Sequence, residues 1–194
     1  MDQLVDEDGW EDVMEQSGIR IFVKAFPESG FKAYRSETII NTSIASIVSM
    51  ALDVEAFSEW VQDTTTVYTV KKESENSKIY YMAIKAPWPI EDRDWVNRVE
   101  VKHQPGPKKV IITYTAVPNL LEDKLDHVRV TSHLAIWVLE PDGKQKTRST
   151  WMGFSDPGGT LPALFVNWTI SSSVLQTTEN IKRQAVKPKY AVHL

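Results

Sequence analysis

The chain contains no cysteine among its 194 residues, which excludes disulfide bonds, thiolate catalysis and Cys-ligated zinc. It also lacks an excess of basic residues: the net charge is −4, so we expect no nucleic-acid partner. No stretch approaches the roughly 18 consecutive apolar residues of a membrane span. Residues 1–15 are acidic and do not have the pattern of a secretory signal, so we expect a cytoplasmic protein.

Side chains suited to catalysis are also sparse. The acidic residues Glu91, Asp92 and Asp94 lie around a predicted turn before a strand, where carboxylates are usually solvated. The histidines are widely separated and lack metal-ligand spacing; they are His103, His127, His133 and His193. We therefore expect no catalytic residue, no metal and no cofactor.

The chain has the length of one domain, spanning residues 1–194, with strands in the majority. The apolar pattern predicts a short acidic helix over 6–16 and a helix over about 44–51, capped by Thr42 or Ser43. Successive hairpins imply a strongly curved antiparallel sheet and an α+β fold. The predicted strands cover residues 19–26, 31–40, 67–72, 78–86, 93–103, 109–117, 128–140 and 146–155.

Residues 155 to about 182 contain the last predicted helix and the rigid turn that introduces it, in which Thr160 is the expected N-cap and Pro162 lies in the first turn of the helix. Ser171 begins a run of three serines on this helix, which either forms a solvated face or leaves room above a cavity. One apolar stripe is expected to pack on the sheet; it contains Leu161, Leu164, Phe165, Trp168 and Leu175, and is widened by Ile170, Val174 and Ile181.

Strand alternation indicates which polar side chains point inward. On 93–101 the drier face carries Arg93, Trp95 and Asn97. On 78–86 alternation alone does not orient the two faces, and on 128–140 both faces could be partly buried, with His133 and Ala135 sharing one. Inward polar groups need partners, which could be one another, a carboxylate such as Asp156, or a ligand in a partly hydrated cavity.

Two segments carry a resemblance to a known family. Residues 85–96 contain a Pro-Trp-Pro loop (87–89) followed by Arg93, Asp94 and Trp95, and residues 156–162 read Asp-Pro-Gly-Gly-Thr-Leu-Pro. Together with Asn167 and Trp168 they resemble the START domain, the lipid-transfer family related to the steroidogenic acute regulatory protein, and most of all its phosphatidylcholine transfer protein branch. The resemblance extends from about residue 9 to about 186.

The resemblance implies a helix-grip fold, in which a curved antiparallel sheet surrounds a long C-terminal helix and encloses one hydrophobic tunnel. It also implies that Ile84 and Trp95 contact ligand, which turns Tyr80 and Met82 inward. The predicted cavity residues are Tyr80, Met82, Ile84, Arg93, Trp95, Asn97, His133, Ala135, Trp168 and Ser171. The predicted gate consists of Trp88, Pro89, Ile90, Gly158, Gly159, Leu161 and Phe165, with Trp88 and Ile90 packed on the first turns of the helix.

The sequence departs from the family at the headgroup positions. Phe57 and Val61 stand where the phosphatidylcholine branch has an Arg and an Asp, and Val99 stands where the sterol branch has a second buried Arg. We therefore expect lipid binding and transfer, with transient contact with a membrane surface, but no particular lipid. Two alternatives stay open. One is a cavity enzyme of the aromatase/cyclase type using Arg93 or His133, and the other is a structural module with a filled interior.

Overall fold

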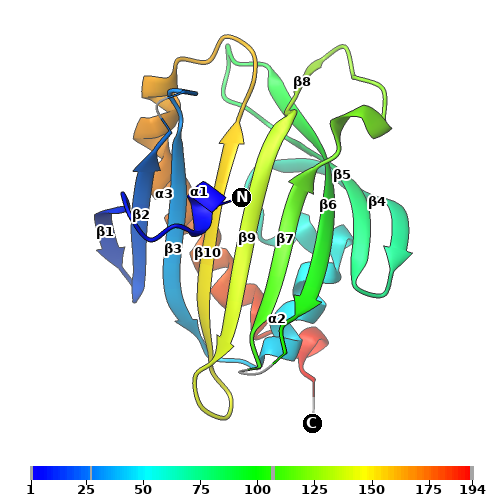
Figure 1. Cartoon of the computed structure of the whole chain (residues 1–194). Helices are drawn as coiled ribbons and strands as arrows, with labels where there is room; N and C mark the ends of the chain where they lie inside the picture. The colour runs from blue at the N-terminus through cyan, green and yellow to red at the C-terminus, as the bar shows by residue number, and fades with distance from the viewer. Residues whose placement is uncertain (1, 27, 106–107, 193–194) are drawn as a thin grey trace.

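One curved sheet dominates the fold, and a long helix lies behind it in the view of Figure 1. The computed structural model describes residues 2–26, 28–105 and 108–192, so Met1, Pro27, Gly106, Pro107, His193 and Leu194 lie outside the described residues. The strand order is β1-β2-β3-β10-β9-β7-β6-β5-β4, and β8 pairs with β6 in parallel at its end. This is the α+β arrangement that the hairpin pattern predicts.

The strands are β1 (Glu11–Gln16), β2 (Ile19–Ala25), β3 (Lys32–Ile40), β4 (Thr64–Ser74), β5 (Ser77–Ile84), β6 (Asp92–His103), β7 (Val110–Ala116), β8 (His127–Arg129), β9 (Ser132–Pro141) and β10 (Thr147–Asp156). The helices are α1 (Asp2–Val5), α2 (Ile44–Leu52) and α3 (Ala163–Ala185), with 3-10 turns η1 (Val54–Glu59), η2 (Pro118–Leu120) and η3 (Pro188–Tyr190). Ser43 caps α2, because its side chain accepts a hydrogen bond from the backbone N–H of Ser46.

The predicted helix over 6–16 is wrong. Residues 11–16 form β1, which pairs with β2 in an antiparallel hairpin. The two turn residues, Ser17 and Gly18, both have positive φ (55° and 69°), which is the geometry that a two-residue hairpin needs. The three apolar residues that suggested a helix were too few to outweigh this turn signal.

The predicted strand over 128–140 is interrupted. Its first part is β8, which runs parallel to β6, and its second part is β9, which lies between β7 and β10. The break comes at Val130, whose N–H donates to the carbonyl of Asp94 at 2.9 Å. Alternation within one segment could not reveal that the chain changes partner strand there.

Helix α3 differs from its prediction at its start and at two residues of its apolar stripe, whereas Val174 and Ile181 of that stripe are buried. It begins at Ala163, with Pro162 in the cap position and no side-chain cap, so Thr160 is not the N-cap. Leu164 and Trp168 are 84% and 78% exposed, and do not pack on the sheet.

The first half of α3 covers a cavity on the inner side of the sheet and is joined to the start of β3 through Asn167, which hydrogen-bonds to the backbone of Gly30 and Lys32. The buried residues of α3 are Val174, Thr178, Ile181, Gln184 and Ala185.

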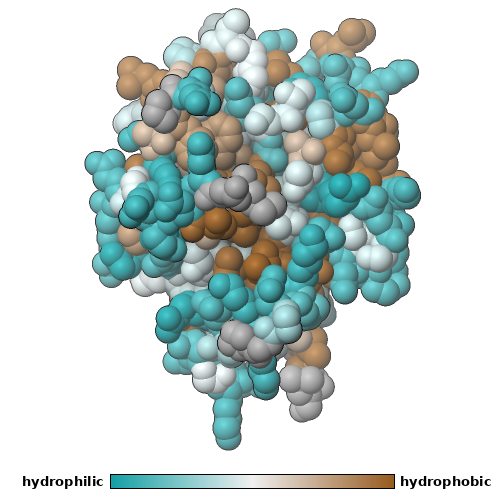
Figure 2. Space-filling model, viewed as in Figure 1, coloured by the Kyte–Doolittle hydropathy of each residue, from teal (hydrophilic) through white to brown (hydrophobic). Residues whose placement is uncertain are grey.

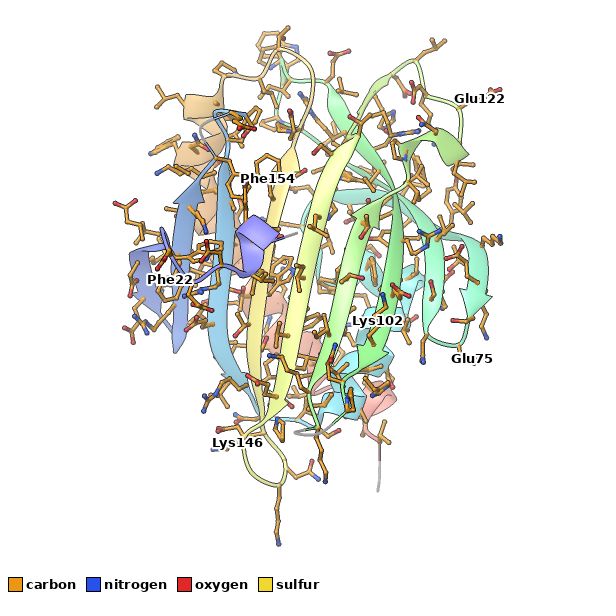
Figure 3. All side chains as sticks on the ribbon, viewed as in Figure 1. Phe22, Glu75, Lys102, Glu122, Lys146 and Phe154 are labelled. Atoms are coloured by element: carbon orange, nitrogen blue, oxygen red, sulfur yellow. The ribbon has the colours of Figure 1, made fainter. Side chains whose placement is uncertain are left out.

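The outer face of the sheet is partly covered by the N-terminal segment. Leu4 on α1 is 4% exposed and joins a cluster with Ile136 and Met152, and the ring of Phe154 stacks on Phe26 with centroids 4.9 Å apart. Figure 2 shows hydrophobic side chains at the centre of this face and hydrophilic ones around them. Phe154 lies close to the upper end of β10 (Figure 3). The other side chains of each alternating strand therefore point to the inner face of the sheet, on which α3 also lies.

Candidate ligand-binding cavity

Two adjoining cavities lie between the inner face of the sheet and α3. The first, which we call the deep cavity, has a volume of about 300 Å³ and is bounded by η1, strands β3, β5, β6, β7, β9 and β10, and the second half of α3. The second, the outer cavity, has a volume of about 440 Å³ and lies under the β5–β6 loop and the first half of α3. The two cavities adjoin, since their walls share Tyr34, Asp63, Ile84, Trp95, Trp151, Ser173 and Thr177.

The walls of the deep cavity come from side chains that alternate along the strands. On β5, Tyr80, Met82 and Ile84 face inward, while Ile79 and Tyr81 pack on the opposite side. The orientation implied by the family resemblance is therefore present in the structure. Trp95 from β6 and His133 and Ala135 from β9 complete the predicted part of the wall.

Several aromatic residues in the wall were not predicted. Tyr34, Phe57, Trp60, Tyr114 and Trp151 line the deep cavity, and the ring centroid of Phe57 lies 4.9 Å from that of Trp60 and 5.1 Å from that of Tyr80. Alternation on β7, which places Val110, Ile112 and Tyr114 on one buried face, was a usable signal for Tyr114. Trp60 follows a 3-10 turn, where no period applies.

Three predicted cavity residues do not line either cavity. Trp168 points to solvent, and Ser171 lies one position off the inward face, where Ser173 lines both cavities instead. Asn97 is 1% exposed and sits behind the wall, with its Nδ2 donating to the Tyr80 hydroxyl at 3.4 Å. These three predictions failed for the same reason. The rotation of α3 and the thickness of the cavity wall depend on packing between distant segments.

Arg93 lies at the outer cavity and is 5% exposed. Its guanidinium donates to the backbone carbonyls of Glu91, Pro157 (3.5 Å) and Gly158 (3.3 Å) and makes no ion pair within the described residues. Asp156, the carboxylate considered as its partner, instead accepts a hydrogen bond from the Gly158 N–H. Burial lowers the pKa of Arg93. This side chain therefore fastens the β5–β6 loop to the turn that precedes α3.

The predicted gate is present only in part. Ile90, Leu161 and Phe165 line the outer cavity, and Pro89 joins them in a shallower pocket beside it. Trp88 is 93% exposed, so the prediction that it packs on the first turns of α3 is wrong. The loop turns its tryptophan outward, and Pro89 and Ile90 lie beside the helix entry.

The two glycines of the gate are required by the backbone. Gly158 and Gly159 have φ values of 66° and 68°, and added Cβ atoms would lie 3.2 Å from Val128 and 3.5 Å from the guanidinium of Arg93. The sequence motif therefore reflects a tight approach of this turn to β6 and β8.

The deep cavity is nearly free of charge. Asp63, an exposed residue at the rim, is the one carboxylate among the residues that line it. Burial lowers the pKa of His133 to about 4, so its imidazole is neutral at pH 7. Burial also raises the pKa values of Tyr34, Tyr80 and Tyr114, so these phenols are protonated as well.

Two further findings concern metal binding and membrane spanning in the described part of the chain. No three His, Asp or Glu side chains there are grouped so that they could hold a metal ion. Among the described residues no helix is long and apolar enough to cross a membrane.

Comparison with known proteins relates this chain to one family. The family model for the START domain matches residues 2–188. An uncharacterized protein of Pseudomonas aeruginosa is 26% identical over 92% of this chain and 87% of its own length. The phosphatidylcholine transfer protein of Mus musculus is 25% identical over 85% of this chain and 78% of its own length.

Solved structures share the fold. The crystal structure of a STAR-related lipid transfer protein from Xanthomonas axonopodis has a TM-score of 0.86 at 24% identity, covering 93% of this chain and 100% of that one. Human StAR-related lipid transfer protein 5 has a TM-score of 0.82 at 21% identity, covering 96% and 90%. The predicted helix-grip fold is therefore confirmed, and the chain belongs to the START domain family.

Proposed function

We propose that this domain binds one lipid or similar hydrophobic molecule in the joined cavities and carries it between membranes. The observation that carries the proposal is the largely aromatic and apolar space between the sheet and α3, whose deep part has one charged residue, Asp63, in its wall. Membership of a family whose relatives include phosphatidylcholine transfer proteins supports it. The existence of the cavities argues against the alternative of a structural module with a filled interior.

We propose further that the ligand is carried unchanged. A Streptomyces aromatase/cyclase shares the fold, with a TM-score of 0.54 at 12% identity, so the fold alone does not separate a carrier from an enzyme. Two features favour the carrier. Arg93 is engaged with three carbonyls, and no acidic group within the described residues orients His133. Neither side chain has the partner that acid–base chemistry requires.

Contact with a membrane is the third part of the proposal. Four apolar side chains are exposed on the segments around the cavity mouth: Trp88 (93%), Leu125 (106%), Leu164 (84%) and Trp168 (78%). Figure 1 shows the β5–β6 loop, the loop before β8 and the start of α3 at the same end of the molecule. We call these four residues the mouth collar. Apolar side chains gathered around an opening suit a lipid surface that delivers a hydrophobic ligand. The cytoplasmic location predicted from the sequence stays a prediction.

The carrier function is tested by native mass spectrometry of the purified protein, followed by transfer of fluorescent lipid between vesicles. Ser173→Trp places an indole in the wall shared by both cavities, whereas Ser172→Trp places it on the exposed face of the same helix. We expect the Ser173 variant to lose the bound adduct and the transfer activity, and the Ser172 variant to keep both. Equal activity of the two variants, or recovery of a chemically altered ligand, would contradict the carrier function.

A further inference from the structure

The wall of the outer cavity carries more positive than negative charge. Its ionisable side chains are three cations, Lys32, Lys85 and Arg93, and one carboxylate, Asp63. Lys85 is paired with Asp92 at 3.1 Å, so its charge is already balanced. Lys32 and Arg93 make no ion pair within the described residues. Two cations in this wall are therefore available to an anion.

The two cations come from two sides of the curved sheet. Lys32 is the first residue of β3, and Arg93 lies on β6 opposite Ile84. In the strand order β10, β9 and β7 separate β3 from β6, yet residues of both strands line this cavity. The start of β3, the β5–β6 loop and the start of α3 lie at the same end of the molecule (Figure 1). A ligand in the outer cavity therefore meets a cation on each side.

The position of Lys32 is fixed by the helix that covers the cavity. The N–H of Lys32 donates to Oδ1 of Asn167 at 2.9 Å, and Nδ2 of Asn167 donates to the carbonyl of Gly30 at 3.0 Å. The side chain of Lys32 is only partly exposed and contributes to the cavity wall. A lysine so placed can turn its ammonium into the cavity or extend it to water. The two arrangements differ in whether this charge acts on a bound ligand.

Arg93 has the stronger need for a counter-charge. Its side chain is 5% exposed and donates to the backbone carbonyls of Glu91, Pro157 and Gly158. A guanidinium has five N–H donors, so these three bonds leave two of them for another acceptor. Carbonyl groups satisfy donors without cancelling the charge, and a buried charge without a counter-charge is unfavourable. An anion in the outer cavity would supply it.

The deep cavity has the opposite character. No Lys or Arg side chain lines it, and its wall is mostly aromatic and aliphatic, with Phe57, Trp137 and Ile181 among its residues. A charged head placed there would lose its hydration and gain no counter-charge, whereas a hydrocarbon chain would gain from burial. The volumes of about 300 and 440 Å³ lie in the range that encloses one small ligand, which suits a lipid with a single chain.

We propose that the outer cavity binds the anionic head of a single-chain lipid, a carboxylate or a phosphate monoester, between Lys32 and Arg93, with the hydrocarbon tail in the deep cavity. This inference rests on the proposed carrier function and names the class of ligand and its orientation. The ligand enters tail first. Its charge stays close to the mouth and never crosses the apolar part of the wall.

The test uses N-phenyl-1-naphthylamine, an uncharged fluorescent probe, displaced by three ligands with the same tail: dodecanoate, dodecyl phosphate and dodecan-1-ol. Wild type is compared with Lys32→Gln at about pH 8, where both anions are ionised. Because each ligand is compared with itself, differences in aqueous solubility cancel. We expect the variant to bind the two anions about tenfold more weakly, as for one lost charge-assisted contact, and dodecan-1-ol equally well.

Two matched variants separate a local contact from an effect of net charge. Lys32→Arg keeps the cation and should keep the affinity for both anions. Lys109→Gln removes the same charge from a partly buried lysine that precedes β7 and lines neither cavity, so it should change the affinity for none of the three ligands. Since Lys32 makes no ion pair in the described structure, Lys32→Gln should leave the melting temperature of the ligand-free protein unchanged.

A further arm distinguishes a lipid head from a free anion. Inorganic phosphate, which has no tail, should not raise the melting temperature, whereas dodecyl phosphate should raise it in wild type and less in Lys32→Gln. An increase with inorganic phosphate that matches the increase with dodecyl phosphate would overturn the assignment to a lipid.

Three other results decide the outcome. Unchanged affinity of Lys32→Gln for both anions would place the ammonium in water and overturn the inference. An equal loss for dodecan-1-ol and the anions would assign Lys32 a structural role and overturn it as well. Failure of the probe and of every ligand to bind would overturn the carrier function itself, which distinguishes the two failures.

Discussion

Asp94 and Arg129 form an ion pair that is removed from solvent almost completely. The guanidinium meets the carboxylate through two contacts of 2.7 and 3.0 Å, and the side chains are 0% and 5% exposed. Arg129 also donates to the carbonyls of Pro118, Leu121 and Glu122, so it holds the loop between β7 and β8. The sequence pattern had placed Asp94 on the solvated side of its strand, which is wrong, because this loop folds over it.

We predict that Asp94→Asn lowers the free energy of unfolding by about 3–5 kcal/mol, since it leaves a buried guanidinium without its buried counter-charge and with only the exposed Asp123 as a carboxylate partner. The control is Glu73→Gln, which breaks the partly exposed pair with Arg98 and should lower the free energy of unfolding much less. Urea unfolding of both variants measures the difference. Similar losses would show that burial of the Asp94 pair contributes nothing special.

His133 makes stability depend on pH. Its pKa is lowered by burial to about 4 in the folded protein, whereas an unfolded histidine titrates near 6.5. Between these values the unfolded chain binds a proton that the folded protein does not bind. The contribution of the neutral His133 to the free energy of unfolding is therefore fully present above about pH 6.5, and it is lost as the pH falls toward 4.

We predict that His133→Leu removes this contribution, which is at most about 3 kcal/mol between pH 6.5 and pH 4. The measurement is the difference between variant and wild type in unfolding free energy at a series of pH values, which cancels the shared titration of carboxylates. His103→Gln, at an exposed residue at the end of β6, should follow wild type. A constant difference across the range would contradict the assigned shift.

At the scale of elements, the mouth is formed by two segments joined through one side chain. The β5–β6 loop contains two prolines, which cannot donate to a strand ladder, and the turn before α3 contains two glycines with positive φ. Arg93 connects them through carbonyls on both sides. Since the first half of α3 overhangs the outer cavity, opening requires these segments to separate and leaves the sheet intact.

We predict that residues 87–91 and 158–165 exchange their amide hydrogens faster than β9, and that Arg93→Leu increases this difference and speeds release of a bound fluorescent lipid. The loss in unfolding free energy should be roughly 1–3 kcal/mol, because the freed carbonyls lie near solvent. Lys85→Leu is the control in the same loop, since it breaks the ion pair with Asp92 and leaves the three carbonyl contacts of Arg93 in place. Equal exchange rates in the loop, the turn and β9 would contradict this local opening of the mouth.

At the scale of the whole molecule, the charges around the cavity mouth are such that binding to a membrane surface relies on apolar contact. The loops that carry the mouth collar hold Glu91, Asp92, Glu122, Asp123 and Asp126 against Lys85 and Lys124. Figure 3 shows Glu122 at this end of the molecule, far from Lys146 at the other. An acidic rim is not attracted to anionic lipids.

We predict that Trp88→Ala and Trp168→Ala each weaken binding to phosphatidylcholine vesicles by roughly tenfold, since each removes a large exposed apolar group, without changing the melting temperature. Adding phosphatidylserine should not strengthen binding. Val186→Ala, at an exposed residue near the opposite end of α3, is the control. Unchanged vesicle binding of both tryptophan variants would assign docking to another face.

Much of this protein was determined by local sequence. Alternation on β6 placed Arg93, Trp95 and Asn97 inward, the hairpin spacing predicted the antiparallel sheet, and the Gly158-Gly159 turn marked the entry to the last helix. These features depend on side-chain period and on backbone φ, both of which are properties of a short segment. The motifs around them were sufficient to identify the family.

Tertiary structure alone decided which surfaces are covered. Trp88 and Trp168 lie in the solvent while Asp94 is buried, and Ser173 rather than Ser171 lines the cavities. Each outcome depends on where a distant segment lies: the loop over Asp94, the position of α3 over the outer cavity, and the rotation of that helix. The pattern of a segment records which side chains share a face, but whether that face meets protein, ligand or water depends on residues remote in sequence.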